Sequence, residues 1–157
     1  MHITSPAFDP GGEIPAQYAN VGAPGGRNVS VPYSWDSPPQ GTKSYALALV
    51  DHAPVAHEWV HWLVADIPSD ATSLPAGASG TSAMPGGAVE LTTTYGRVGY
   101  GGPNPPRGTG SHPYEATLYA LDVPSLGLPP ATKIDAFSRA IAGHVLGQAS
   151  VTGYVGR

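Results

Sequence analysis

The stretch HEWVH, at residues 57–61, has the residue types and the spacing of a metal site. Its two histidines, His57 and His61, lie four apart, and Glu58 follows the first, which is the H-E-x-x-H pattern of zinc metalloproteases. On a helix, residues four apart lie on one face and can share a zinc ion at bond lengths of about 2.0–2.1 Å. On a strand, the same step spans about 13 Å, at about 3.3 Å per residue, which is too far for one ion. The backbone that carries the stretch therefore decides its chemistry.

The residues around this stretch favour a strand. The segment EWVHWLVADI is rich in tryptophan and β-branched residues and is closed by Pro68, so we predict a strand over Glu58–Ile67. No third ligand follows at a helical offset. We therefore predict no metal site, and a zinc hydrolase at HEWVH is the less favoured alternative.

Side chains alternate on a strand, so His61 is expected to share a face with Trp59 and Leu63. The opposite face would take Val60, Trp62 and Val64. A single histidine on such an apolar face is more often a core residue with an ordinary partner than a functional one. Its significance depends on what other parts of the chain bring beside it.

A second pair of candidate residues follows a loop that is dense in glycine and proline. The loop spans residues 95–110, with the sequence YGRVGYGGPNPPRGTG, and it delivers His112 and Tyr114 to the start of a strand. Prolines stiffen such a loop, and glycines let backbone N–H groups approach a ligand closely. His112 and Tyr114 lie two apart, so in an extended segment they point the same way and, beside free amides, form a small anion-accepting site. The alternative is a surface turn with a packing tyrosine.

These residues belong to a chain of many short strands joined by turns. It has 157 residues, and its 21 glycines and 18 prolines lie between apolar runs, which favours one mostly β domain over residues 1–157. We predict further strands over Ser44–Val50 and Tyr114–Val123. The only predicted helix covers Lys133–Leu146, where apolar residues recur every three or four positions. A long connection rich in Ser, Gly, Ala and Pro covers Ser69–Gly87.

Composition and charge exclude several classes of function. The formal net charge is −4 and the 7 basic residues form no cluster, so we predict no nucleic-acid partner. No run of about eighteen apolar residues is present, which predicts no transmembrane segment, and the N-terminus lacks the pattern of a signal peptide. The chain has no cysteine, which excludes disulfides, thiolate zinc sites and thiol catalysis. We expect a cytoplasmic location and no cofactor.

Five segments in a fixed order carry more information than any single motif. They are FDPGGEIPAQYA, NVSVPYSWDSPPQGTKSYALALVDHAP, EWVHWLVADIP, GGPNPPRGTGSHPYEATLYALD and GHVLGQASVTGYVGR. With them the chain resembles, over nearly its whole length, the phosphatidylethanolamine-binding proteins, which include Raf kinase inhibitor protein, plant flowering-time regulators and small bacterial and archaeal homologues. The resemblance implies a β-sandwich with a central antiparallel sheet and a few peripheral helices, in agreement with the turn-rich strand pattern.

The resemblance also implies an anion pocket. Family members bind phosphate-like anions and phospholipid head groups there, so the expected ligand is a phosphate-containing small molecule or such a head group. The ligand-binding residues that the resemblance implies are Asp51, Trp59, His61, Pro105, Pro106, His112 and Tyr114. It assigns no catalytic residue. It further implies a homodimer and a kinase or protease partner, for which an exposed connection over Ser69–Gly87 would serve.

The chain departs from the family pattern at three places around this pocket. The D-P-D-A-P turn is one residue shorter, as Asp51-His52-Ala53-Pro54, so either Asp51 keeps the role of the first aspartate or His52 replaces the second. The N-D-[FY]-G pattern reads Thr93-Thr94-Tyr95-Gly96, and Asn104 stands where the family has a cysteine. These differences bear on the identity of the ligand and not on the fold.

The expected pocket residues suggest how an anion would be held. Two histidines and a tyrosine are donors without a large fixed charge, so binding should be weak near neutral pH and tighten as the histidines take up protons around their usual pKa of about 6.5. Asp51 beside a histidine would fix its tautomer. The alternative is an enzyme, a lyase, cyclase or hydrolase, that uses Asp51 with His61 or His112 as a base. Neither a cysteine nor a serine in a strained elbow accompanies them as a nucleophile.

Overall fold

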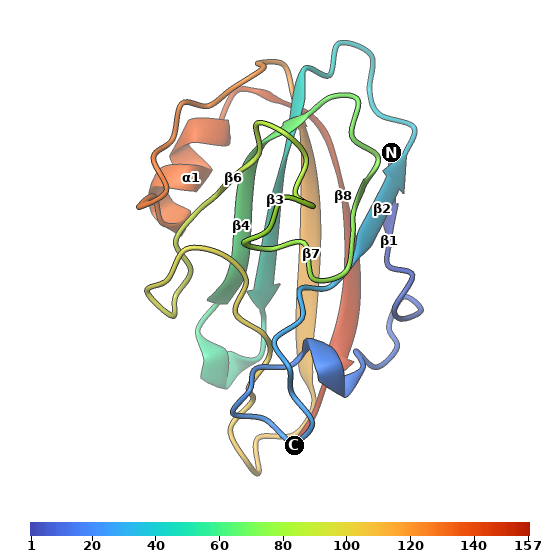
Figure 1. The fold of residues 1–157 in the computed structure, drawn as a ribbon, viewed down its shortest axis with the longest axis vertical. Coiled ribbons are helices and arrows are strands. Elements are labelled where there is room, and N and C mark those ends of the chain that lie inside the picture. The colour runs from blue at the N-terminus through green and yellow to red at the C-terminus, as the bar shows by residue number, and fades with distance from the viewer.

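The computed structural model describes all of residues 1–157 and is built around a five-stranded antiparallel sheet (Figure 1). The order of its strands is β6 (Val89–Glu90), β4 (Trp59–Pro68), β3 (Ser44–Asp51), β7 (His112–Leu121) and β8 (Val145–Val155). A smaller antiparallel sheet has the order β1 (His2–Thr4), β2 (Tyr33–Asp36) and β5 (Ser73–Leu74). The helical elements are α1 (Ile134–Ile141) and the 3₁₀ turns η1 (Ala16–Tyr18) and η2 (Pro54–Ala56). The predicted mostly β sandwich with a central antiparallel sheet is confirmed.

The central sheet is covered on both faces, and β3 shows how the sequence achieves this. Its residues alternate between two apolar clusters, with Leu47 and Leu49 in the larger one and Ala46 and Ala48 in the smaller one. The larger cluster fills the space between the two sheets and includes Trp35 of β2. The smaller cluster lies under α1 and includes its Phe137 and Ile141. A strand buried on both faces reads as the continuous apolar run seen in the sequence.

The helix is shorter than predicted. It ends at Ile141 because Gly143 adopts a left-handed conformation with φ of 82°, which an α-helix cannot continue through. The residues that follow form β8, a long strand that the sequence analysis missed. An apolar residue at Val145 extends the helical spacing, and two glycines weaken the strand pattern of β8, so the error has a local cause. α1 has 8 residues, and no helix of the chain is long and apolar enough to cross a membrane.

The HEWVH stretch enters a strand and not a helix, and the strand begins at Trp59, one residue after the predicted start at Glu58. His57 and Glu58 precede β4 in left-handed conformations, with φ of 49° and 57°, so the strand begins at Trp59. His57 is exposed and His61 is buried inside β4. The helical geometry that a zinc site of the H-E-x-x-H type requires is therefore not formed.

A bulge at His61 changes which side chains of β4 share a face. Leu49 of β3 pairs with Trp62 and Val50 pairs with Val60, which leaves His61 as an extra residue between them. Trp62 consequently lies on the side of the larger cluster and Val60 on the side of the smaller one. The expected common face for Val60 and Trp62 was wrong, because simple alternation does not allow for the inserted residue.

The connection over Ser69–Gly87 is largely exposed but is anchored at several points. Leu74 and Ala78 are buried. The carboxylate of Glu90 accepts hydrogen bonds from the Ser79 hydroxyl and, at 2.8 Å each, from the indole N–H of Trp62 and the backbone N–H of Gly80. The connection is thereby held to the core of the molecule.

Candidate functional site

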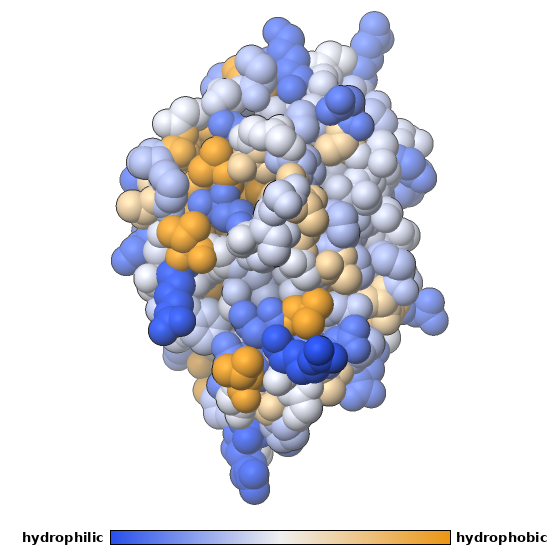
Figure 2. All heavy atoms as spheres, in the orientation of Figure 1, coloured by the Kyte–Doolittle hydropathy of each residue, from blue (hydrophilic) through white to orange (hydrophobic).

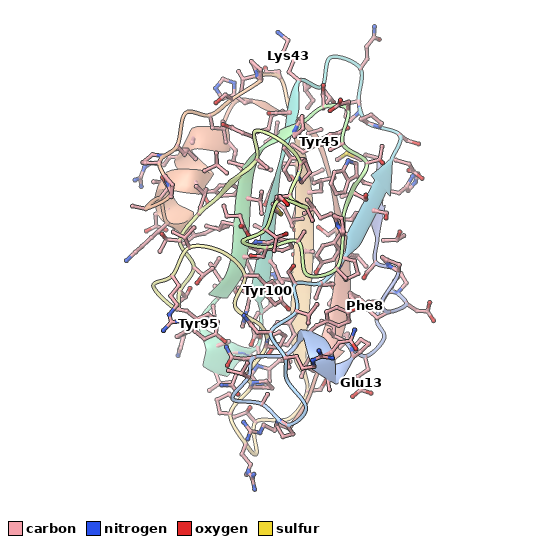
Figure 3. All side chains as sticks on the ribbon, viewed as in Figure 1. Phe8, Glu13, Lys43, Tyr45, Tyr95 and Tyr100 are labelled. Carbon is pink, nitrogen blue, oxygen red and sulfur yellow. The ribbon has the colours of Figure 1, made fainter.

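A cavity of about 310 Å³ opens where β3 ends and where β4 and β7 begin. The register of the sheet places Asp51 between Trp59 on one side and Tyr114 on the other. All the residues that the resemblance implied line this cavity, namely Asp51, Trp59, His61, Pro105, Pro106, His112 and Tyr114. Figure 3 shows Tyr95 at the end of the molecule that carries η2, well away from Lys43 and Tyr45 at the other end.

Four further residues complete the wall and were not predicted as part of it. Val55 and Ala56 come from η2, and Tyr95 and Asn104 come from the loop between β6 and β7. Tyr95 occupies the aromatic position of the N-D-[FY]-G pattern, and Asn104 stands where the family has a cysteine. These two positions in the family pattern were the signal that could have placed both residues in the wall. Nothing in the sequence of η2 pointed to Val55 or Ala56.

Asp51 and His112 form a buried pair beneath the cavity. Oδ2 of Asp51 lies 2.7 Å from Nδ1 of His112, and the two residues are 4% and 1% exposed. The other oxygen of Asp51 accepts the backbone N–H of Ala53 at 2.9 Å. Because a carboxylate only accepts hydrogen bonds, the proton of this pair lies on Nδ1, and Asp51 fixes the tautomer as expected.

The second nitrogen of His112 is also occupied. Nε2 lies 2.8 Å from the Thr109 hydroxyl, which itself lies 2.6 Å from the carbonyl oxygen of Pro106. The hydroxyl has one proton and can donate it to Nε2 of His112 or to the carbonyl of Pro106. In both arrangements each ring nitrogen of His112 lies within hydrogen-bond distance of a partner in the chain, so this geometry leaves no free nitrogen of His112 for a ligand.

His61 is held in one tautomer by the backbone of Gly101. Its Nδ1 lies 2.7 Å from the carbonyl oxygen of Gly101, and the N–H of Gly101 donates to the carbonyl of His61 at 2.9 Å. A carbonyl oxygen only accepts, so Nδ1 carries the proton and Nε2 has no partner in the chain. Burial, which outweighs the attraction of Asp51, lowers the pKa of His61 to about 4. The ring is therefore neutral at pH 7, in contrast to the expected protonation around pH 6.5.

The aromatic rings of the wall pack edge to face. Tyr95 lies 5.4 Å from Trp59 and 5.6 Å from His61, and Tyr114 lies 5.1 Å from His61, measured between ring centroids. The hydroxyl of Tyr95 donates to the carbonyl of Gly102 at 2.7 Å, which fixes the ring in place. Gly101 makes this packing possible, because a Cβ there would clash with the Tyr95 ring.

Two buried donors on the wall have no hydrogen-bond partner. They are the indole N–H of Trp59 and the hydroxyl of Tyr114. Burial and the nearby charge of Asp51 raise the pKa of Tyr114 far above its usual value, so the hydroxyl stays protonated. The cavity thus offers two unused donors, from Trp59 and Tyr114, and one unused acceptor, Nε2 of His61.

The shortened turn keeps Asp51 inside and places His52 outside. Nδ1 of His52 lies 2.7 Å from Glu58, and Nε2 lies 3.1 Å from Glu115, both at the surface. Asp51 therefore supplies the only carboxylate of the cavity wall.

Figure 2 shows the apolar side chains of the face drawn there in several groups set among polar ones. Val55, at 51% exposed, is the one strongly exposed aliphatic side chain of the cavity wall, beside the exposed Pro106.

Comparison with known proteins gives consistent matches over the whole chain. Residues 4–156 match the family described as phosphatidylethanolamine-binding protein. The chain is 37% identical over 153 residues to a UPF0098 protein of Methanothermobacter thermautotrophicus, covering 98% of the chain and 97% of that protein. It is 40% identical over 154 residues to the putative lipoprotein LppC of Mycobacterium tuberculosis, covering 98% of the chain and 71% of LppC. Its fold is similar to the crystal structure of YbcL of Escherichia coli, described as a new member of the mammalian PEBP family, with a TM-score of 0.91 and 28% identity over 98% of the chain and 96% of that chain.

Proposed function

The chain belongs to the phosphatidylethanolamine-binding protein family, and on this premise we propose that it binds a phosphate-containing small molecule or phosphate head group in the cavity at the end of the central sheet. The observation that carries the proposal is the pair of buried donors without partners, on Trp59 and Tyr114. Leaving such a group unpaired costs about 1–3 kcal/mol, which a ligand oxygen would recover on binding.

The other features of the cavity agree with a small oxygen-rich ligand. Its volume of about 310 Å³ lies at the lower end of the usual range of ligand pockets, about 300–1,000 Å³. The free polar atoms of the cavity belong to Trp59, His61 and Tyr114. The hydrogen-bonded pair of Asp51 and His112 supports the wall from beneath, and Pro105 forms part of its side. Since no lysine or arginine lines the cavity, we expect dissociation constants from millimolar to high micromolar, equivalent to about 4–5.5 kcal/mol of binding free energy.

Catalysis is less well supported than binding. Both oxygens of Asp51 and both nitrogens of His112 are engaged, and no serine, threonine or cysteine lines the cavity as a nucleophile. The kinase or protease partner that the family resemblance implied stays a prediction; the 69–87 connection that would serve it is largely exposed and is anchored through Glu90. A cytoplasmic location stays a prediction, since a relative that matches 98% of the chain is named a putative lipoprotein.

The test is a titration of the protein with inorganic phosphate and phosphoethanolamine, followed by NMR of the Trp59 indole and His61 ring protons at low ionic strength. We expect saturable shifts of both. Tyr114→Phe, which removes one free donor, should weaken binding about tenfold, the effect of about 1.4 kcal/mol. Tyr154→Phe is the control, because Tyr154 is exposed and lies outside the cavity wall. Wild-type affinity in Tyr114→Phe, or the absence of any saturable shift, would disprove the proposal.

A further inference from the structure

The free acceptor of the cavity is as informative as its free donors. Because the carbonyl oxygen of Gly101 accepts a hydrogen bond from Nδ1 of His61, the ring proton lies on Nδ1 and Nε2 presents a lone pair. An anionic oxygen also presents lone pairs, so it would meet Nε2 without a proton between them. A ligand that fills the cavity must therefore bring a proton, or His61 must take one up.

Burial disfavours a second proton on the His61 ring and outweighs the groups around it that would favour one. From β3, Asp51 is the only negative side chain, and it is already paired with His112 of β7 at 2.7 Å. Tyr114 of β7 and Tyr95 of the preceding loop face the ring edge to face as neutral hydroxyls, since burial raises the pKa of Tyr95 to about 12. His61 itself is 3% exposed, and burial lowers its pKa to about 4.

Phosphate esters differ in whether they can supply that proton. A phosphomonoester has a second pKa near 6, and its monoanion keeps one P–O–H group beside two charged or double-bonded oxygens. That form offers one donor for Nε2 of His61 and acceptors for the indole of Trp59 and the hydroxyl of Tyr114. A phosphodiester, which is the linkage in an intact phospholipid, has no P–O–H group.

We infer that the cavity selects phosphomonoesters, bound with one proton shared between the phosphate and Nε2 of His61, over phosphodiesters. The inference rests on the proposed binding function and narrows its ligand to a small phosphomonoester. The complex holds one proton more than the free protein and the phosphate dianion. Affinity for a monoester must then fall about tenfold for each pH unit above the second pKa of the ligand, near 6.

The experiment compares methyl phosphate with dimethyl phosphate on the full chain, by calorimetric or NMR titration at about pH 5 and about pH 8, on either side of the second phosphate pKa. We expect methyl phosphate to bind at the lower pH, to lose at least about tenfold in affinity at the higher pH, and to exceed dimethyl phosphate by at least about tenfold at the lower pH. His61→Gln replaces the lone pair at this position with an amide that can donate or accept. The variant should lose both the pH dependence and the discrimination.

The outcomes separate this inference from the proposed function. Equal binding of the two esters, or monoester binding that does not change with pH, overturns the inference and leaves phosphate binding in place. Binding of neither ester overturns both. If His61→Gln does not fold, as judged by near-UV circular dichroism, the two wild-type measurements decide the question without it.

Discussion

Nδ1 of His112 lies 2.7 Å from Oδ2 of Asp51 in a pair that water hardly reaches. Removing one partner of such a pair leaves the other buried without compensation, which typically costs about 3–5 kcal/mol. Asp51→Ala also removes the acceptor of the Ala53 N–H. We therefore expect this variant to lower the free energy of unfolding, measured by urea denaturation, by about that amount.

Asp36→Ala is the matched control for this measurement. Asp36 pairs with His2 at 2.9 Å, but the side chains are 71% and 77% exposed, so water replaces the lost contact. The two aspartate–histidine pairs thus differ mainly in burial. A loss of stability in Asp51→Ala no larger than that in Asp36→Ala would show that the buried pair contributes little.

The lowered pKa of His61 predicts how stability changes with pH. The pKa is about 4 in the folded chain and about 6.5 in the unfolded chain, so between these values the unfolded state binds more protons. Stability from this residue is complete above pH 6.5 and is lost as the pH falls toward 4, by about 3 kcal/mol in total. His61→Gln removes this contribution. Its unfolding free energy should fall less steeply than that of the wild type over this window, and parallel curves would contradict the assignment.

Gly101 tests how tightly the cavity wall is packed. A Cβ at this position would overlap the ring of Tyr95, which contacts both Trp59 and His61. Gly101→Ala should therefore displace Tyr95, lower stability by about 1–3 kcal/mol as overpacking does, and weaken phosphate binding. Gly86→Ala is the control, because a Cβ there meets no atom within 4 Å. Near-UV circular dichroism and the phosphate titration check both variants. An unchanged near-UV spectrum together with wild-type phosphate affinity in Gly101→Ala would refute the prediction.

The sequence indicated which residues line the cavity better than it indicated their hydrogen bonds. Asp51, His61 and His112 were implied by the resemblance to the family, and the sheet register brings them together at one cavity. Their hydrogen bonds depend on residues far away in the chain, such as Gly101 and Thr109. The local sequence pattern therefore could not predict that the His61 ring is neutral or that both ring nitrogens of His112 are hydrogen-bonded.

The strands themselves show the same limit. β3 and the start of β4 followed from apolar composition, because burial on both faces leaves a continuous run. Apolar composition did not predict the bulge at His61, because the bulge depends on the register between β4 and β3. It did not predict β8 either, because that strand depends on pairing with β7. Long-range pairing overrides local propensity in both cases.

We predict that the Tyr114 hydroxyl lowers the stability of the free protein and strengthens phosphate binding. Its hydroxyl is buried without a partner in the free protein, so Tyr114→Phe removes an unsatisfied polar group and should raise the free energy of unfolding by about 1 kcal/mol while it weakens phosphate binding. A purely structural hydroxyl would behave in the opposite way, since its loss would destabilise the chain. Thermal or urea unfolding without ligand distinguishes the two. A less stable Tyr114→Phe would mean that the hydroxyl has a partner in solution.

Glu90 links the core to the 69–87 connection through three hydrogen bonds, from Trp62, Ser79 and Gly80. Glu90→Ala leaves the fully buried indole N–H of Trp62 unpaired, which should cost about 1–3 kcal/mol. It also releases the backbone N–H of Gly80, so amide hydrogen exchange at Gly80 should accelerate relative to the strands of the central sheet. Glu13→Ala is the control, because Glu13 is exposed and its side chain forms no hydrogen bond within the chain. Unchanged exchange at Gly80 in Glu90→Ala would show that the buried Leu74 and Ala78 hold the connection without this carboxylate.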